Sequence, residues 1–384
     1  MTTAPTAPPD ASELAALTEE IREYVRGPGE EWAQRIERER AVAPELWQEL
    51  NDRGYLRLAA PVEYGGRGLR FTDYLPLLEL FSMSHAALRM IVHVCNGVWR
   101  SIDSHASPEQ RERFVLPQIS GEIRVAFTLT EPTAGTGADL RCSVVREGDT
   151  YYLSGEKHMI TFGTISDYLL LFARVAGTTG ADGTVALMVP PHGEGITATV
   201  MPETMGVRGS DHGAFVFDRA PVPVANRLGE EGEGLGVALS GFLTPSRIAV
   251  AMTCVGLAKR ALELAVQYAT TRETFGKKIA ERQAIAFSLA EAKTEIEAAR
   301  ALVMQSAERW ESGADANADS AMAKLFAVSM LGRVTDIALQ AHGGIGYWSS
   351  SPIERVYRDA RAQRFEEGTN EIQKTVIARA LLRG

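Results

Sequence analysis

The hydrophobic period of this 384-residue chain changes twice, and that change constrains the fold more than any other feature. From Ser12 to about Ser120, apolar residues recur every three or four positions, which is typical of amphipathic helices. From Arg124 to about Val224, short segments of alternating polarity are separated by glycine-rich stretches, which is typical of strands. From Leu243 onward, long runs with helical spacing return. We therefore expect helices, then a sheet, then helices.

These three segments predict an α+β multidomain fold. We place an N-terminal α-helical domain at residues 1–120, with a flexible tail at 1–11, a middle antiparallel β domain at 121–235 and a C-terminal four-helix bundle at 236–384. Two or three domains are expected for this length, because a domain averages about 150 residues. No helices alternate with the strands, which excludes a doubly wound sheet.

Composition excludes several classes of protein. The net charge of −9 argues against nucleic acid or an anionic membrane as the main partner. The three cysteines, Cys95, Cys142 and Cys254, form no CxxC pair, so neither a disulfide framework nor a zinc site is expected. No run of 18 apolar residues and no secretory signal is visible. We expect a soluble cytoplasmic protein with no metal and no membrane span.

Neither glycine cluster matches a nucleotide-binding fingerprint. Gly232-Glu-Gly234-Leu-Gly236 has Val237 where a Rossmann motif needs its third glycine, and no strand of a βαβ unit leads into it. Gly343-Gly-Ile-Gly346 follows a helix instead of starting one. A Walker A motif is absent as well. Nicotinamide and nucleotide fingerprints are therefore not supported.

Five segments in a fixed order carry a resemblance to a known family. They are Glu63-Tyr-Gly-Gly66, Ala126-Phe-Thr-Leu-Thr-Glu-Pro132, Lys157-His-Met-Ile-Thr161, Arg272-Glu-Thr-Phe-Gly276 with Gln283, and Gln340-Ala-His-Gly-Gly-Ile-Gly346 continuing through Tyr357-Arg-Asp-Ala360 to Glu367-Gly-Thr369. Together with the helix–sheet–helix order, they resemble the acyl-CoA dehydrogenase family of flavoenzymes. The resemblance implies an acyl-CoA dehydrogenase-like fold with FAD as the cofactor.

The resemblance assigns the flavin ring to the middle domain. It places Phe127, Leu129 and Thr130 at the pyrimidine edge, Met159 behind the ring and Thr161 near the reactive nitrogen. Met159 departs from the family, because an aromatic residue is common there. Judged from the residues alone, a β-hairpin with satisfied threonines is the simpler interpretation.

A second group is assigned to the adenine-nucleotide half of FAD. The resemblance implies that this group spans a subunit boundary and that the protein is a homotetramer. Its members are Arg272, Thr274, Phe275 and Gln283, with Gln340, Gly343 and Gly344 from a neighbouring subunit, and Thr369 is also assigned to the cofactor. A guanidinium such as Arg272 binds a diphosphate through charge-assisted hydrogen bonds. The alternative is a surface arginine beside a helix end.

Glu367 is the candidate catalytic base. Removing a proton α to a thioester carbonyl needs a carboxylate in a site dry enough to raise its pKa. The family's base is the Glu of the Glu-Gly-Thr motif, which is Glu367 here. A minority of relatives place the base on the helix near Thr244, where this chain has Ser246. Judged from the residues alone, a Glu at a helix start more often complements the helix dipole.

Substrate contacts are assigned to Thr136, Arg247 and Gly368. Thr136-Gly137 replaces the family's usual Ser-Asp, and Arg247 is equally explained as a solvated arginine in a first helical turn. Three further residues at spacings of four, His85, Arg89 and His93, share one helix face. They either recognise a polar acyl tail or are solvent-exposed or packed against Glu residues, and the second interpretation is favoured.

Glu366 stands where an aromatic residue often precedes the base. It either raises the pKa of Glu367 through like-charge repulsion or points to solvent.

The resemblance predicts FAD-dependent dehydrogenation of an acyl thioester to the trans-2-enoyl thioester. The acyl carrier is coenzyme A or an acyl carrier protein, and the electron acceptor is an electron-transferring flavoprotein or a similar carrier. Two alternatives stay open. One is a flavin-dependent oxidase or monooxygenase on the same fold, and the other is a cofactor-free helical binding protein.

Overall fold

The computed structural model describes residues 7–133 and 139–382, which form helices, a sheet and helices in that order. The N-terminal helices are α1 (Ala11–Arg26), α2 (Pro28–Glu39), α3 (Pro44–Asp52), α4 (Phe71–Phe81), α5 (Ala86–Gly97), α6 (Trp99–Asp103), α7 (Pro108–Gln110) and α8 (Leu116–Ser120). Helix α1 begins at a capping box, in which the Asp10 carboxylate accepts the Glu13 N–H and the Glu13 carboxylate accepts the Asp10 N–H.

The middle segment forms one sheet of eight strands. They are β1 (Val125–Thr128), β2 (Ser143–Glu147), β3 (Thr150–Thr161), β4 (Tyr168–Val175), β5 (Thr184–Val189), β6 (Ile196–Val200), β7 (His212–Pro223) and β8 (Arg227–Leu228). The strand order is β6-β7-β3-β2-β4-β5-β8, and β1 also pairs with β4.

The sheet is mixed, so the prediction of an antiparallel domain was wrong in this detail. Strands β1 and β2 both run parallel to β4 and share one of its edges end to end, whereas the other pairs are antiparallel. Alternating polarity shows which residues face the core but carries no information about strand direction, which depends on how the chain crosses the sheet.

Within the described residues, the C-terminal segment has the four helices expected of a bundle and two shorter ones. Helices α9 (Gly234–Ala238) and α10 (Thr244–Thr271) join through a π-helical turn at Leu239–Leu243, and α11 (Gln283–Glu311), α12 (Asn317–His342), α13 (Pro352–Ala362) and α14 (Asn370–Leu382) follow. A short hairpin of β9 (Glu273–Thr274) and β10 (Lys277–Lys278) connects α10 to α11.

Helix α10 is the centre of the fold. The helical run from α9 through α10 is long and apolar enough to cross a membrane, but its most apolar stretch is 76% buried within the protein. Its inward side chains, such as Ile248, Met252 and Val255, share one core with α1, α4, α5, α11 and α12. We conclude that α10 is a core helix on which the N-terminal helices and the bundle pack.

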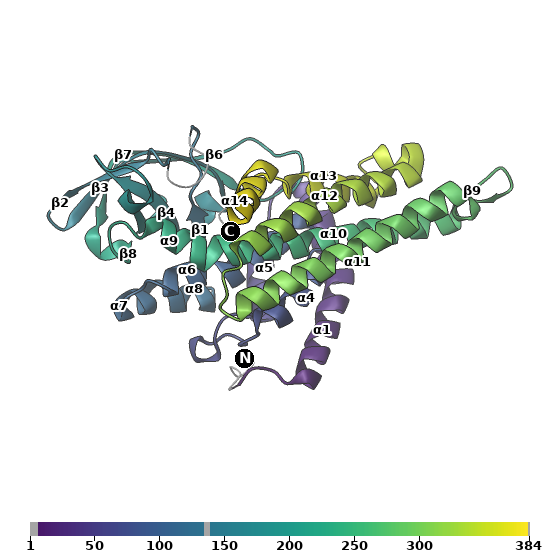
Figure 1. The fold of residues 1–384 in the computed structure, drawn as a ribbon, viewed down its shortest axis with the longest axis horizontal. Helices are drawn as coiled ribbons and strands as arrows, with labels where there is room; N and C mark the ends of the chain where they lie inside the picture. The colour runs from purple at the N-terminus through teal and green to yellow at the C-terminus, as the bar shows by residue number, and fades with distance from the viewer. Residues whose placement is uncertain (1–6, 134–138, 383–384) are drawn as a thin grey trace.

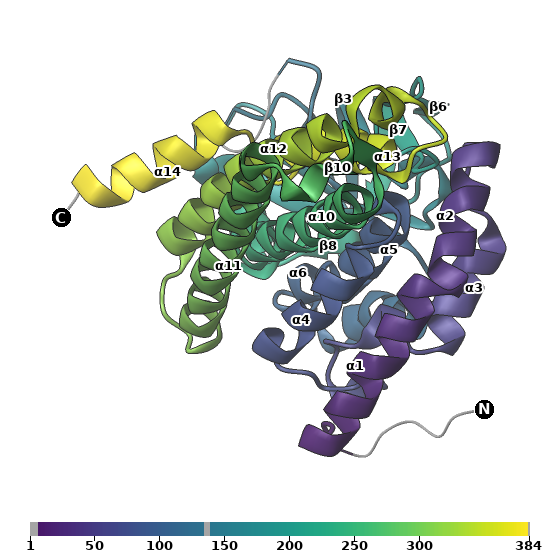
Figure 2. The ribbon, with the colours of Figure 1, turned by 90° about the vertical axis from the view of Figure 1, so that its right-hand side faces the viewer.

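The sheet and the β9–β10 hairpin lie at opposite ends of the molecule. Figure 1 shows the sheet at one end of the long axis, with α10, α11 and α12 running from it to the hairpin at the other end. Figure 2 shows α14 extending away from the rest of the bundle. The positions of the sheet, the hairpin and α14 limit where a ligand that contacts these elements is able to bind.

Candidate active site

Glu367 lies in the loop between α13 and α14, in a backbone conformation that few side chains adopt. Its φ is 53° and that of Gly368 is 94°, both in the left-handed region. Gln373 Nε2 donates to the carbonyl oxygens of Glu367 (3.0 Å) and Gly368 (3.1 Å), and the Lys324 ammonium on α12 also donates to the Gly368 carbonyl. Such conformations persist where surrounding contacts fix them, often at functional sites. The loop therefore holds Glu367 in a set direction.

The Glu367 carboxylate is bound by a serine from α10. Ser246 Oγ donates to Glu367 Oε1 at 2.8 Å, and His93 Nε2 on α5 lies 2.9 Å from the same Ser246 oxygen. Both Ser246 and His93 are buried. Three elements that are distant in sequence thus converge in one hydrogen-bonded chain, and no side chain or backbone group of the described residues donates to the other oxygen of Glu367.

Glu366 is paired inside the protein and does not point to solvent. Arg89 on α5 places Nη1 at 3.1 Å from Glu366 Oε2 and Nη2 at 3.1 Å from Oε1, and Gln363 Nε2 donates to Oε1 at 3.0 Å. Burial alone favours the neutral acid, but Arg89 outweighs it and holds the pKa of Glu366 below its ordinary value. Arg89 is thus committed to Glu366, which agrees with the favoured interpretation that this helix face packs against Glu residues.

The other two residues of that helix face are buried as well. His85 Nε2 lies 3.3 Å from Glu37 Oε1 on α2, and His93 contacts Ser246. Packing against Glu residues therefore describes His85 and Arg89, whereas His93 belongs to the hydrogen-bonded chain of Glu367. Solvent exposure describes none of the three.

The environment of Glu367 moves its pKa to the range a general base needs. Burial raises the pKa to about 7, the Ser246 hydrogen bond opposes the rise, and the neighbouring Glu366 charge adds to it. The cations of Lys324 and Arg247 lower it in part. A base with a pKa near 7 is present in both protonation states at neutral pH, which suits it to take up and release a proton.

Arg247 is a buried residue and not a solvated first-turn arginine. It is 5% exposed, and its Nη1 donates to Asn317 Oδ1 at 2.7 Å. Lys324, which sequence reasoning missed, is also fully buried, and within residues 7–133 and 139–382 it forms no ion pair. A lone lysine inside the apolar stretch Ala321–Ala327 was the signal that could have revealed it.

The predicted flavin-ring residues gather where β1 and β3 meet. The His158 N–H donates to the Thr130 carbonyl at 3.1 Å, and beside it Met159 is 52% exposed on a left-handed backbone at a register shift of β3. Thr130 and Thr161 are both partly exposed. Open side chains next to an irregular strand leave room for a planar ligand, so these residues fit a flavin ring.

A buried ion pair supports this surface from behind. Lys157 Nζ contacts Glu131 Oε1 at 2.9 Å and the Leu129 carbonyl at 2.8 Å. Glu131 in turn accepts the backbone N–H groups of Arg141 and Cys142. Because both charges are paired and hydrogen-bonded, the end of β1 has a fixed position relative to β3.

Aromatic contacts connect the predicted flavin surface to the base. The ring of Phe127 on β1 stacks on Phe242 with centroids 4.6 Å apart, and Phe242 lies 6.1 Å from the His93 ring. Phe242, His93 and Ser246 also line one narrow cavity. Phe127 and Glu367 are thus linked through residues in direct contact, namely Phe242, His93 and Ser246.

The residues predicted for the adenine-nucleotide half lie at the far end of the molecule. Arg272 and Thr274 precede Phe275, which is 97% exposed on the β9–β10 hairpin (Figure 1). Gln283 begins α11. Gln340 lies in the last turn of α12, and Gly343 and Gly344, where an added Cβ atom would meet open space, directly follow that helix.

A ring contact joins the two parts of this group. Tyr268 near the end of α10 stacks on His342 at the end of α12, with centroids 4.6 Å apart. The Arg272 N–H donates to the Tyr268 carbonyl at 2.9 Å, and Gly343 directly follows His342. The adenine group therefore forms one cluster within the chain, but that cluster does not meet the flavin group on the sheet.

The remaining predicted site residues are Gly368, Thr369 and Thr136. Gly368 and Thr369 lie at the start of α14 next to the base, and Thr369 is exposed. Thr136 lies outside the described residues. Within the described part of the chain, no group of three or more His, Cys, Asp or Glu side chains is placed to hold a metal ion.

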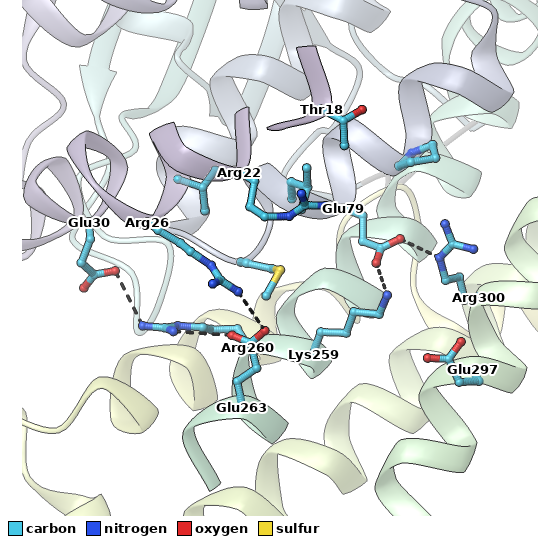
Figure 3. Close-up of a pocket in the computed structure, with 14 residues that line it drawn as sticks. Thr18, Arg22, Arg26, Glu30, Glu79, Lys259, Arg260, Glu263, Glu297 and Arg300 are labelled. Carbon is cyan, nitrogen blue, oxygen red and sulfur yellow. Dashed lines mark hydrogen bonds and ion pairs between the residues drawn. The ribbon is translucent and has the colours of Figure 1, made fainter. Parts of the chain in front are cut away.

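A cavity of about 610 Å³ lies away from Glu367, between α1, α4, α10 and α11 (Figure 3). Its charges neutralise one another: Glu79 contacts both Lys259 and Arg300, and Glu263 contacts both Arg26 and Arg260. Opposite charges that already satisfy each other leave little to attract a charged ligand. We therefore assign the chemistry to the Glu367 region.

Comparison with protein-family models matches three consecutive parts of the chain. Residues 11–122 match the acyl-CoA dehydrogenase N-terminal domain, 126–220 the middle domain and 232–382 the C-terminal domain.

Individual proteins match over nearly the whole length. An acyl-CoA dehydrogenase of Bacillus subtilis (strain 168) is 34% identical over 97% of this chain and 98% of its own. The caffeyl-CoA reductase-Etf complex subunit CarC of Acetobacterium woodii is 33% identical over 88% of this chain and 91% of its own. The solved structure of butyryl-CoA dehydrogenase from Megasphaera elsdenii superposes with a TM-score of 0.91 at 32% identity, over 96% of this chain and 98% of that one.

Proposed function

Because the chain belongs to the acyl-CoA dehydrogenase family, we propose that Glu367 is the base with which it dehydrogenates an acyl-CoA thioester. The protein is an oxidoreductase that acts on acyl-CoA and uses FAD. The product is the trans-2-enoyl thioester. One observation carries the role of Glu367: it is a partly buried carboxylate with a pKa raised to about 7, held in a fixed loop.

We assign the cofactor to two groups of residues. Thr130, Met159 and Thr161 on the sheet would hold the flavin ring, and Arg272 with the end of α12 would hold the diphosphate and adenine. Bound there, FAD would supply the acceptor for the β-hydrogen of the substrate, which leaves as hydride. The open face at Met159 and the exposed hairpin at Phe275 both have space for a ligand, which supports this assignment.

The protein's own groups perform the proton step. Glu367 takes the α-proton on the oxygen that Ser246 does not bind, and its backbone N–H is the donor that we assign to the thioester carbonyl. Lys324 and Gln373 hold the loop by its carbonyl oxygens, so the carboxylate does not need to reorganise during the reaction. Arg89 neutralises Glu366 and limits its repulsion of the charged base.

Reduction of an enoyl thioester is a second candidate direction. CarC is named as a reductase subunit, and a carboxyl group with a pKa near 7 is able to give back a proton as readily as it accepts one. The direction then depends on the electron partner. An electron-transferring flavoprotein is the partner that we propose, because CarC is named as part of an Etf complex.

We propose that the enzyme is a homotetramer in the cytoplasm. Within one chain, the flavin group on the sheet and the adenine group at the hairpin lie at opposite ends (Figure 1). A single FAD would therefore need residues from two copies of the chain. Exposed apolar side chains of the C-terminal helices support an association of copies: Phe287, Met322, Phe326, Ile372, Leu381 and Leu382.

Anaerobic flavin bleaching with a panel of acyl-CoA thioesters tests the proposal. We expect at least one thioester to bleach the flavin, and we expect slow reoxidation by air with fast reoxidation by an electron carrier. Stoichiometric peroxide at every turnover would show that the enzyme is an oxidase. An acyl carrier protein thioester that outcompetes every CoA thioester would show that the acyl carrier is the carrier protein and not coenzyme A.

A further inference from the structure

The hydrogen bonds around Ser246 have only one consistent direction while Glu367 is ionised. Ser246 has one hydroxyl proton, and the Glu367 carboxylate requires it because it has none of its own. Ser246 Oγ must then accept from His93, so the ring carries its proton on Nε2. When Glu367 gains a proton and the ring proton of His93 moves from Nε2 to Nδ1, the same three groups are able to reverse direction: Glu367 donates to Ser246, and Ser246 donates to His93 Nε2.

His93 also lines a small cavity. The cavity has a volume of about 10 Å³, which is room for about one water molecule. Its lining includes His93, Tyr74 and Arg100. Tyr74 is 2% exposed, and its hydroxyl has no hydrogen-bond partner in the described part of the chain, so it is available to a water molecule there. Arg100 is partly exposed, which brings the cavity towards the surface.

We propose that Ser246 and His93 relay protons between Glu367 and this cavity. After Glu367 has taken the proton from the substrate, the ring proton of His93 first shifts from Nε2 to Nδ1. The Glu367 proton then passes to Ser246 Oγ as the serine proton passes to the bare Nε2, and the Nδ1 proton leaves to a water molecule in the cavity. The ring finishes neutral with its proton on Nε2, as it began, so one proton enters the chain and one leaves. Ser246 and His93 act through Glu367 and are positioning residues.

The surroundings of His93 disfavour a doubly protonated ring, so a proton that reaches the ring is passed on. Burial lowers the pKa of His93 to about 3, and the cations of Arg89 and Arg100 lower it further against the opposing charge of Glu366. A ring that resists a second proton does not trap the one in transit. Within residues 7–133 and 139–382, Arg100 has no carboxylate partner; it lies 4.7 Å from the Trp99 ring centroid and donates to the Asn96 carbonyl.

This relay rests on the proposed role of Glu367, and it has a purpose in that reaction. A base in a dry site gains one proton in each turnover while the thioester covers its open side. Without an exit, the proton waits until the product leaves. A path through α10 and α5 would let the base reset while the acyl group is still bound.

Deuterium washout from acetyl-CoA labelled at its α-carbon tests the relay in the FAD-loaded enzyme. Acetyl-CoA has α-hydrogens but no β-hydrogen, so it reports proton removal without hydride transfer. Washout into water is compared with the rate of anaerobic flavin bleaching by butyryl-CoA, which reports the chemical step. The variants are Ser246→Ala, which removes the hydroxyl, and His93→Gln, which keeps a polar group near Ser246 but has no tautomer to shift.

In both variants, we expect the ratio of the washout rate to the bleaching rate to fall by about tenfold or more, because an interrupted relay returns the same deuteron to the substrate. Ser246→Thr keeps the hydroxyl and should restore the wild-type ratio. A purely structural role would slow both measurements alike and leave the ratio unchanged, which would overturn the relay. Glu367→Gln separates the two proposals. If this variant still washes out deuterium, Glu367 is not the base. If it shows no washout while Ser246→Ala keeps the wild-type ratio of washout to bleaching, only the relay is wrong.

Discussion

Arg89 forms a two-point ion pair with Glu366, with each of its terminal nitrogens 3.1 Å from one carboxylate oxygen. Arg89 comes from α5, and Glu366 directly precedes the proposed base in the loop before α14. The pair therefore fastens that loop to the N-terminal helices. It also places a neutralised charge, and not a free one, beside Glu367.

Breaking this ion pair should destabilise the protein. Arg89→Met leaves Glu366 buried without its partner, and such a loss typically costs about 3–5 kcal/mol. Chemical denaturation would measure the free energy of unfolding. The double variant Arg89→Met/Glu366→Met removes both charges and should recover most of the loss, whereas a double variant no more stable than the single one would contradict the explanation.

The pH dependence of dehydrogenation should follow Glu367. The carboxylate must be ionised to accept a proton, and its pKa is raised to about 7, so kcat/KM should rise with pH and level off above about 7. The ascending limb is measured with an acyl-CoA substrate from pH 5 upward. A limb centred near pH 4.5, the ordinary value for Glu, would show that burial does not tune this group.

Glu366→Gln should move that limb to lower pH. The substitution removes a like charge beside Glu367 and leaves the Arg89 cation without its counter-charge, and both changes favour the ionised base. Activity at high pH should change much less than in Glu367→Gln. An upward shift of the limb would contradict the geometry.

Folding stability should also depend on the charge of Glu367. Its pKa in the folded protein is above the ordinary value of 4.5, so the folded state binds more protons than the unfolded state between about pH 4.5 and 7, and stability falls as pH rises through that window. Glu367→Gln should lose this contribution and become more stable than wild type at pH 8, by roughly 1–3 kcal/mol. Chemical denaturation of the variant and the wild type at pH 5 and pH 8 measures this contribution. An equal difference in the free energy of unfolding at the two pH values would contradict the raised pKa.

FAD retention should depend on the hairpin end of the chain. Arg272→Ala removes the proposed diphosphate contact, and an unpaired charged partner typically costs about 2–5 kcal/mol. The flavin absorbance that remains after gel filtration reports retention. Arg309→Ala is the matched control, because Arg309 is an exposed arginine of α11 that pairs with Asp319. Equal retention in the two variants would remove Arg272 from the cofactor site.

Local pattern was sufficient to predict the order of helices, sheet and helices, whereas Glu367 was singled out by the family resemblance. The change of period marks where the sheet begins and ends, and the Glu-Gly-Thr sequence marks a loop where glycine permits a left-handed backbone. Strand direction was not predictable, because β1 and β4 face the core in the same way whether parallel or antiparallel.

The hydrogen-bonded surroundings of the base were not predictable either. Ser246, His93 and Lys324 come from three helices separated by many residues, and only tertiary packing decides that they meet. Arg89 and His93 were visible as a helix face, but their partners were not. The charge of Glu366 could have pointed either to solvent or to a partner, and the choice depends on where α5 lies.

The proposed function requires Glu367 to be the group that removes the α-proton. Anaerobic mixing of Glu367→Gln with an acyl-CoA that bleaches the wild-type flavin tests it most directly. The amide keeps the shape of the side chain but does not accept the proton, so we predict a variant that retains FAD, changes its flavin spectrum on binding the thioester and bleaches at least about 10²–10⁴-fold more slowly. Bleaching by Glu367→Gln at the wild-type rate would contradict the account.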